Sequence, residues 1–178
     1  MSASSIHCKE LFRKYINPVF IETGSYLGDG IQQAIDAGFK KIYSIELSRN
    51  FYTHCCDRFE KNEIVHCICG DSGEKLFEVM EEQNEQITFW LDGHYSGGDT
   101  AIGPENTPLL RELEAIKRHP IKTHTILIDD LRGWIRELRG FDTLDLMKKI
   151  LEINPDYVFT LEDGFIPNDI LVAKCLNR

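Results

Sequence analysis

The chain has 178 residues, of which 42% are hydrophobic and 28% charged, and its formal net charge is −9. This composition predicts one soluble globular domain with a substantial core. The acidic charge disfavours a nucleic-acid partner, which needs a basic face, and no apolar run is long enough to cross a bilayer. The first residues lack a secretory-signal pattern and the six cysteines include no C-x-x-C pair, so we expect a cytoplasmic protein with reduced thiols.

Short apolar runs alternate with amphipathic segments along most of the chain. The runs predict five strands, at Val19–Ile21, Lys41–Ile45, Ile64–Cys69, Ile87–Leu91 and Thr125–Ile128. The amphipathic segments predict helices at Ile6–Tyr15, Gly30–Ala37, Ser48–Phe59, Ser72–Glu82 and Pro108–Arg118. Since strand–helix–strand units make right-handed crossovers, we expect these five strands to form a parallel sheet.

The end of the chain departs from this alternation. A helix is predicted at Phe141–Ile153, and strands at Tyr157–Leu161 and Ile170–Lys174. The segment between these two strands is rich in turn residues and leaves no room for a crossover helix, so the strands must pair antiparallel. The sequence therefore predicts a single α/β domain over residues 1–178 that ends in an antiparallel hairpin.

Carboxylates stand at the ends of all five parallel strands. They are Glu22, Glu46, Asp71, Asp92 and the pair Asp129-Asp130. Each one alone could cap the following helix. Because the carboxyl ends of parallel strands share one edge, where open α/β folds bind ligands, together they indicate a site. Carboxylates brought together repel, so the ligand should be cationic or rich in hydroxyls and amines.

The first of these strands leads into a glycine-rich turn. A phosphate-binding P-loop is excluded, because the sequence contains no Gly-Lys dipeptide. A dinucleotide fingerprint starting from Gly28 and Gly30 would need glycine or alanine where Gln33 stands, which disfavours a nicotinamide-dependent reductase.

The pattern E-x-G-x-x-x-G-x-G from Glu22 to Gly30 resembles motif I of the class I S-adenosylmethionine-dependent methyltransferases. The resemblance implies a Rossmann-like, seven-stranded, mostly parallel sheet of order 3-2-1-4-5-7-6. It implies that Glu46 holds the ribose hydroxyls and that Gly70-Asp71-Ser72 lies beside the adenine. The residues expected to bind S-adenosylmethionine are Glu22, Thr23, Gly24, Ser25, Gly28, Gly30, Glu46, Asp71, Ser72 and Asp92.

The ends of the fourth and fifth strands are similar to those of metal-dependent sugar O-methyltransferases of the macrocin type. This resemblance implies that Asp92, Asp129 and Asp130 bind Mg²⁺ or Mn²⁺, hard cations that prefer oxygen ligands. It also suggests His94 as general base, with Asp92 required for turnover. A metal that binds two neighbouring hydroxyls would act as a Lewis acid, because an alkyl hydroxyl is a very weak acid.

The leading hypothesis is therefore a divalent-cation-dependent O-methyltransferase acting on a sugar, a glycan or another vicinal diol. Two alternatives stay open: a metal-independent small-molecule methyltransferase, and a non-catalytic S-adenosylmethionine-binding module of a larger glycan-synthesis enzyme. The chain is short for the family it resembles. Acceptor recognition is thus expected to rest on the loops after the fourth and fifth strands, on a second copy of the chain or on a neighbouring domain.

Overall fold

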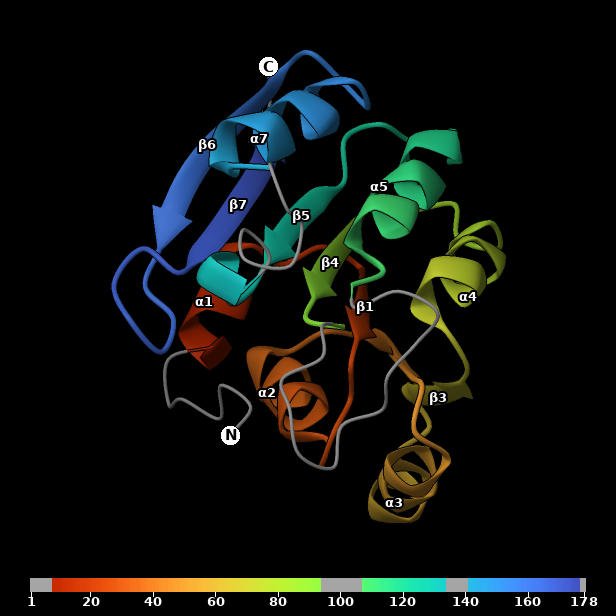
Figure 1. Ribbon diagram of the computed structural model, residues 1–178. Coiled ribbons are helices and arrows are strands. Elements are labelled where there is room, and N and C mark those ends of the chain that lie inside the picture. Colours follow the sequence, from red (N-terminus) through yellow and green to blue (C-terminus); the bar gives the residue numbers. More distant parts are fainter. Residues whose placement is uncertain (1–7, 94–106, 134–140, 177–178) are drawn as a thin grey trace.

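The computed structural model describes residues 8–93, 107–133 and 141–176 (Figure 1). Its strands are β1 (Val19–Thr23), β2 (Lys41–Glu46), β3 (Val65–Cys69), β4 (Ile87–Leu91), β5 (Thr125–Ile128), β6 (Tyr157–Glu162) and β7 (Ile170–Cys175). Its helices are α1 (Cys8–Lys14), α2 (Asp29–Ala37), α3 (Arg49–Phe59), α4 (Ser72–Met80), α5 (Leu109–Arg118) and α7 (Thr143–Leu151). None of the helices within the described ranges is long and apolar enough to span a membrane.

The seven strands form one sheet of order β3-β2-β1-β4-β5-β7-β6. Strands β1 to β5 pair in parallel, and β7 runs antiparallel to both β5 and β6. The predicted sheet order and the terminal hairpin are confirmed. The last helix begins two residues later than predicted, at Thr143, because Asp142 caps it by accepting from the backbone N–H of Asp145.

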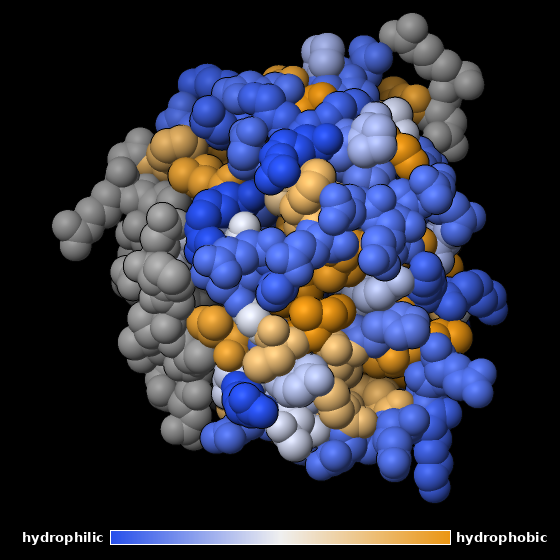
Figure 2. All heavy atoms as spheres, turned by 90° about the vertical axis from the view of Figure 1, so that its right-hand side faces the viewer, coloured by the Kyte–Doolittle hydropathy of each residue, from blue (hydrophilic) through white to orange (hydrophobic). Residues whose placement is uncertain are grey.

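Two apolar layers sandwich the sheet. Every residue of β1, β4 and β5 is buried, as expected of central parallel strands covered on both faces. Alternate residues of β1 enter different layers: Phe20 packs with α1, α2 and α3, whereas Ile21 packs with α4, α5 and α7. The face that carries α4 and β3 is largely hydrophilic, with smaller hydrophobic areas between polar side chains (Figure 2).

Two fully buried histidines connect α5 with the starts of β4 and β5. Nδ1 of His124 accepts from the backbone N–H of Ile87 (3.1 Å), so the neutral ring carries its proton on Nε2 and donates it to Nδ1 of His119 (2.9 Å). Nε2 of His119 then donates to the carbonyl oxygen of Gln83 (3.2 Å). Burial, followed by the neighbouring His119, lowers the pKa of His124 to about 3.

We expect His124 to make the fold sensitive to acid. Because the folded-state pKa of His124 lies below its unfolded value of 6.5, its contribution is present above pH 6.5 and is lost as the pH falls towards 3. For each unit by which the pH falls, the free energy of unfolding should drop by about 1.4 kcal/mol more in the wild type than in His124→Gln, whose glutamine cannot titrate. Denaturant unfolding between pH 6 and pH 4 measures both slopes, and parallel curves would contradict the expectation.

Candidate functional site

Glycines let the chain turn sharply between β1 and α2. Gly24 and Gly28 have positive φ angles of 83° and 82°, which L side chains rarely adopt. A Cβ on Gly24 would lie 2.6 Å from the carbonyl oxygen of Asp92, so glycine permits the turn to touch the end of β4. Thr23 fastens the same junction, since its carbonyl and hydroxyl oxygens accept from the backbone N–H of Asp92 (3.2 and 3.3 Å).

Glu22 is a buried carboxylate beneath this turn. Its Oε2 accepts from the hydroxyl of Ser44 (2.6 Å), which in turn lies 2.5 Å from the hydroxyl of Ser25. A Cβ on Gly30 would overlap Oε1 of Glu22, so the first turn of α2 packs directly on this carboxylate. Burial raises the pKa of Glu22 to about 8, and the charge of Asp92 adds to the effect. A cation bound nearby would favour the ionised form.

A hollow of about 350 Å³, open to solvent, lies beside the glycine turn. Three acidic side chains line it, Glu22, Asp29 and Asp92, together with the amide of Gln33. The other lining residues are Cys8, Phe12, Gly24, Ser25, Gly30 and Trp90. The hollow therefore brings together five of the predicted cofactor residues, and its acidic lining suits an ammonium group.

Glu46 ends β2 next to the same turn. Its Oε2 accepts from the backbone N–H of Tyr26 (2.9 Å) and its Oε1 from that of Ser48 (2.7 Å). Burial raises the pKa of Glu46, and the backbone hydrogen bonds, led by that from Ser48, oppose the rise. The carboxylate is thus held on both sides at the ligand edge of the sheet, where it can accept from hydroxyl groups.

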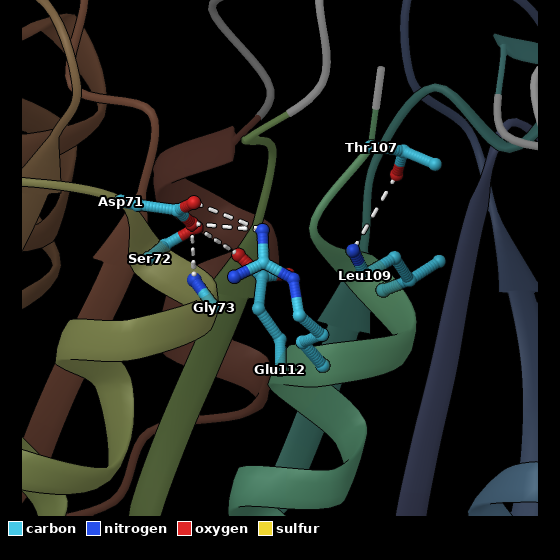
Figure 3. Close-up of polar contacts among 7 residues, drawn as sticks. Asp71, Ser72, Gly73, Thr107, Leu109 and Glu112 are labelled. Atoms are coloured by element: carbon cyan, nitrogen blue, oxygen red, sulfur yellow. Dashed lines mark hydrogen bonds and ion pairs between the residues drawn. The ribbon is translucent and has the colours of Figure 1, made fainter. Parts of the chain in front are cut away.

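The turn after β3 adjoins Glu46, because the backbone N–H of Gly70 donates to the Glu46 carbonyl (2.9 Å). Asp71 caps α4 by accepting from the backbone N–H of Gly73 (2.8 Å), and it is also paired with Arg111 of α5 (2.9 Å). Next to it, the hydroxyl of Ser72 donates to Oε1 of Glu112 (2.5 Å), as Figure 3 shows. Asp71 and Ser72, both predicted to bind the adenine, therefore share this edge with Glu46.

The ends of β4 and β5 bring acids together on the other side of the glycine turn. Asp129 is buried, with 1% of its surface exposed; burial and then the charge of Asp92 raise its pKa to about 8. Asp130, with a positive φ of 48°, is paired with Arg132 (3.0 Å). The Arg132 side chain also binds Asp169, the last residue of the turn before β7.

The predicted three-aspartate metal site is not assembled in this arrangement. Among residues 8–93, 107–133 and 141–176, no group of three or more His, Cys, Asp or Glu side chains could hold a metal ion. The physical reason lies in the two aspartates that follow β5. Asp130 is paired with Arg132. Asp129 packs under the hairpin turn, where its Oδ1 lies 3.4 Å from the position that a Cβ on Gly164 would take. Asp92 lies close enough to Asp129 for its charge to raise the pKa of Asp129, and metal binding by the three aspartates stays a prediction. His94 lies outside the described residues.

Comparisons by sequence and by structure differ. No protein-family model matches the sequence, and no curated protein matches it. Solved structures do match this chain. The Podospora anserina methyltransferase PaMTH1, solved with bound SAH, superposes with a TM-score of 0.63 at 13% identity over 95% of this chain and 76% of its own. The chain has the methyltransferase fold.

Two further structures agree. A Bacillus cereus O-methyltransferase in complex with SAH has a TM-score of 0.64 at 12% identity, over 93% of this chain and 78% of its own. The O-methyltransferase TomG from Streptomyces achromogenes, involved in tomaymycin synthesis and solved with SAM, gives 0.64 at 12% identity, over 95% and 78%. At these identities the likeness establishes the methyltransferase fold, and the chemistry rests on the residues of this chain.

Sequence reasoning missed two polar residues of the site, Arg111 and Glu112. Glu112 is fully buried, and burial raises its pKa to about 7 against the lowering effect of hydrogen bonds from Ser72 and then Thr23. A signal existed. Glu112 stands at helical spacing between the buried Leu109 and Ile116, so an acid occupies the apolar face of α5. An acid in such a position needs a polar partner, which the turn after β3 supplies.

Proposed function

We propose that the chain is an S-adenosylmethionine-dependent methyltransferase that methylates a hydroxyl group of a small, uncharged or cationic acceptor. The observation that carries the proposal is the gathering of Glu22, Glu46 and Asp71 with the glycine turn along one edge of a methyltransferase-fold sheet. Five of the lining residues of the acidic hollow are among those that the sequence predicts to bind the cofactor.

The chemistry of the edge matches the parts of this cofactor in order along the sheet. The acidic hollow beside β1 and β4 suits the methionine ammonium and the sulfonium charge. Glu46 at the end of β2 suits the two neighbouring ribose hydroxyls, each of which donates a hydrogen bond. For the edge of the adenine, the turn after β3 offers an acceptor in Asp71 and a donor in the backbone N–H of Ser72, which as the first residue of α4 has no acceptor within the helix.

Proton removal is assigned to the carboxylates at the ends of β4 and β5. The acceptor oxygen attacks the methyl carbon, the carbon–sulfur bond breaks, and the hydroxyl proton passes to the protein. Asp92 and Asp129 lie close enough for one charge to raise the pKa of the other, so this pair can take up the proton near neutral pH. The fold contributes by aligning oxygen, carbon and sulfur, which accounts for much of the rate in such transfers.

The acceptor class and the metal site predicted from the sequence are also part of this proposal. A sugar or another vicinal diol fits the acidic edge, which repels anionic acceptors. The residues described do not form a preassembled cation site, and a divalent cation at Asp92, Asp129 and Asp130 and a general base at His94 stay predictions. The non-catalytic alternative predicts cofactor binding without turnover.

Methyl transfer tests the proposal directly. The protein is incubated with S-adenosylmethionine and a panel of monosaccharides, glycosides and catechols, with EDTA or with MnCl₂, and release of S-adenosylhomocysteine is measured. Turnover of at least one hydroxylated acceptor is expected. Cofactor binding without turnover of any acceptor in either condition would favour the non-catalytic module.

Variants of the adjacent Asp129 and Asp130 distinguish a proton-accepting role from a metal-binding one. Asp129→Asn should lower kcat about 100-fold, the loss typical of a missing general base. Asp130→Asn should lower it less than fivefold, because Asp130 is engaged by Arg132. Equal losses in both variants, combined with inactivation by EDTA, would instead support the three-aspartate metal site.

A further inference from the structure

Two neighbouring residues of α5, Arg111 and Glu112, each hold a residue of the turn after β3. Nη2 of Arg111 contacts both carboxylate oxygens of Asp71, Oδ1 at 3.1 Å and Oδ2 at 2.9 Å. Oε1 of Glu112 accepts from the Ser72 hydroxyl at 2.5 Å. Consecutive residues of one helix therefore fix consecutive residues of a turn that lies in another part of the sequence (Figure 3).

The backbone of the turn is adapted to this contact. A Cβ on Gly73 would overlap the guanidinium of Arg111, so the absence of a side chain lets Arg111 lie against the first turn of α4. Glu112 also reaches the end of β4: a Cβ on Gly93 would lie 3.3 Å from its Oε1 and 3.3 Å from the Thr23 hydroxyl oxygen. The start of α5 thus contacts the residues that follow two cofactor-edge strands, β3 and β4.

The hydrogen bonds leave Asp71 with one oriented acceptor position. Oδ1 already accepts from Gly73 and from Arg111, whereas within the described parts of the chain Oδ2 accepts from Arg111 alone. Each carboxylate oxygen can accept two hydrogen bonds, so Oδ2 can take one more donor. Because Nη2 of Arg111 contacts both oxygens and the N–H of Gly73 binds Oδ1, the carboxylate is held in one orientation, and with it the direction of that remaining position.

We propose that Arg111 and Glu112 are positioning residues that set the selectivity of the cofactor site for a 6-aminopurine. The inference rests on the proposed function and deepens it. An adenine presents a donor at its 6-amino group and an acceptor at N1, matching Oδ2 of Asp71 and the backbone N–H of Ser72, which as the first residue of α4 has no acceptor within the helix. A 6-oxopurine reverses both, with an oxygen facing Asp71 and an N1–H facing that amide. Without Arg111, the Asp71 side chain loses the fixed orientation that distinguishes the two bases.

Isothermal titration of the full chain with S-adenosylhomocysteine and S-inosylhomocysteine tests this. The wild type is expected to prefer the adenosyl compound at least about tenfold, the worth of one lost hydrogen bond plus the penalty of opposed groups. In Arg111→Gln the affinity for the adenosyl compound should fall about tenfold while that for the inosyl compound changes less than threefold. Ser72→Ala, which frees Glu112, should reduce the preference in the same direction.

Lys117→Gln is the matched control, since Lys117 lies on the same helix and pairs with the exposed Glu152 away from the site. It should leave both affinities unchanged. Arg111→Lys, which keeps the charge but loses the planar guanidinium that lies against Gly73, serves as the second variant should Arg111→Gln unfold, and should show an intermediate preference. Equal weakening of both ligands, or an unchanged preference, would overturn the positioning role; a wild type that binds neither compound would refute the proposed function itself.

Discussion

Replacing Gly30 with alanine is expected to lower the free energy of unfolding by about 2 kcal/mol and to abolish detectable S-adenosylhomocysteine binding. The added Cβ would overlap Oε1 of Glu22, a carboxylate that is 2% exposed and held by Ser44. Alanine favours a helix over glycine by about 1 kcal/mol, so a net loss of stability would show that the clash outweighs this gain. Urea unfolding and isothermal titration give the two quantities.

Removing the Glu22 carboxylate should relieve the clash. In the double variant Gly30→Ala/Glu22→Ala the oxygen that meets the new methyl group is gone, so the two changes should be less destabilising together than their sum. Gln32→Ala, on the exposed part of the same helix, controls for the change in helix propensity. A Gly30→Ala protein as stable as the wild type and still able to bind the ligand would show that α2 does not pack on Glu22 in this way.

Replacing Glu46 with glutamine is expected to weaken S-adenosylhomocysteine binding about 100-fold, since two charge-assisted hydrogen bonds to the ribose would be lost. The amide is the same size as the carboxylate but carries an NH₂ group, which would face the backbone N–H of either Tyr26 or Ser48. Two donors would then oppose each other, so the glycine turn should also shift. The exposed Glu60, just beyond α3, provides the control Glu60→Gln. A loss smaller than threefold would exclude Glu46 as the ribose ligand.

The sequence predicts the sheet and the places of the strand-end carboxylates because both depend on local signals. Strands buried on both faces are short apolar runs, and the residue that follows each run marks the edge; Glu22, Glu46 and Asp71 were found in this way and lie there. The hairpin was found because Asp163-Gly164 and Pro167-Asn168 leave no room for a helix.

The pairing of side chains within the site depends on contacts between segments that are distant in the sequence, which no local pattern encodes. The contact of Arg111 with Asp71 spans 40 residues, and Arg132 reaches Asp169 across 37. An Asp-Asp pair after a strand indicates oxygen ligands, and its sequence does not reveal that Asp130 is paired with Arg132. Glu112 was the exception, because a lone acid on an apolar helix face is visible in the sequence.

The most direct test of the account is a calorimetric titration of the wild-type chain with S-adenosylhomocysteine at pH 7.5, with NAD as the comparison. We predict one site per chain with a dissociation constant at or below about 100 μM, and no heat from NAD. Absence of binding at millimolar S-adenosylhomocysteine, or tighter binding of NAD, would contradict the claim that these strand-end carboxylates and the glycine turn form an adenosyl-methionine site.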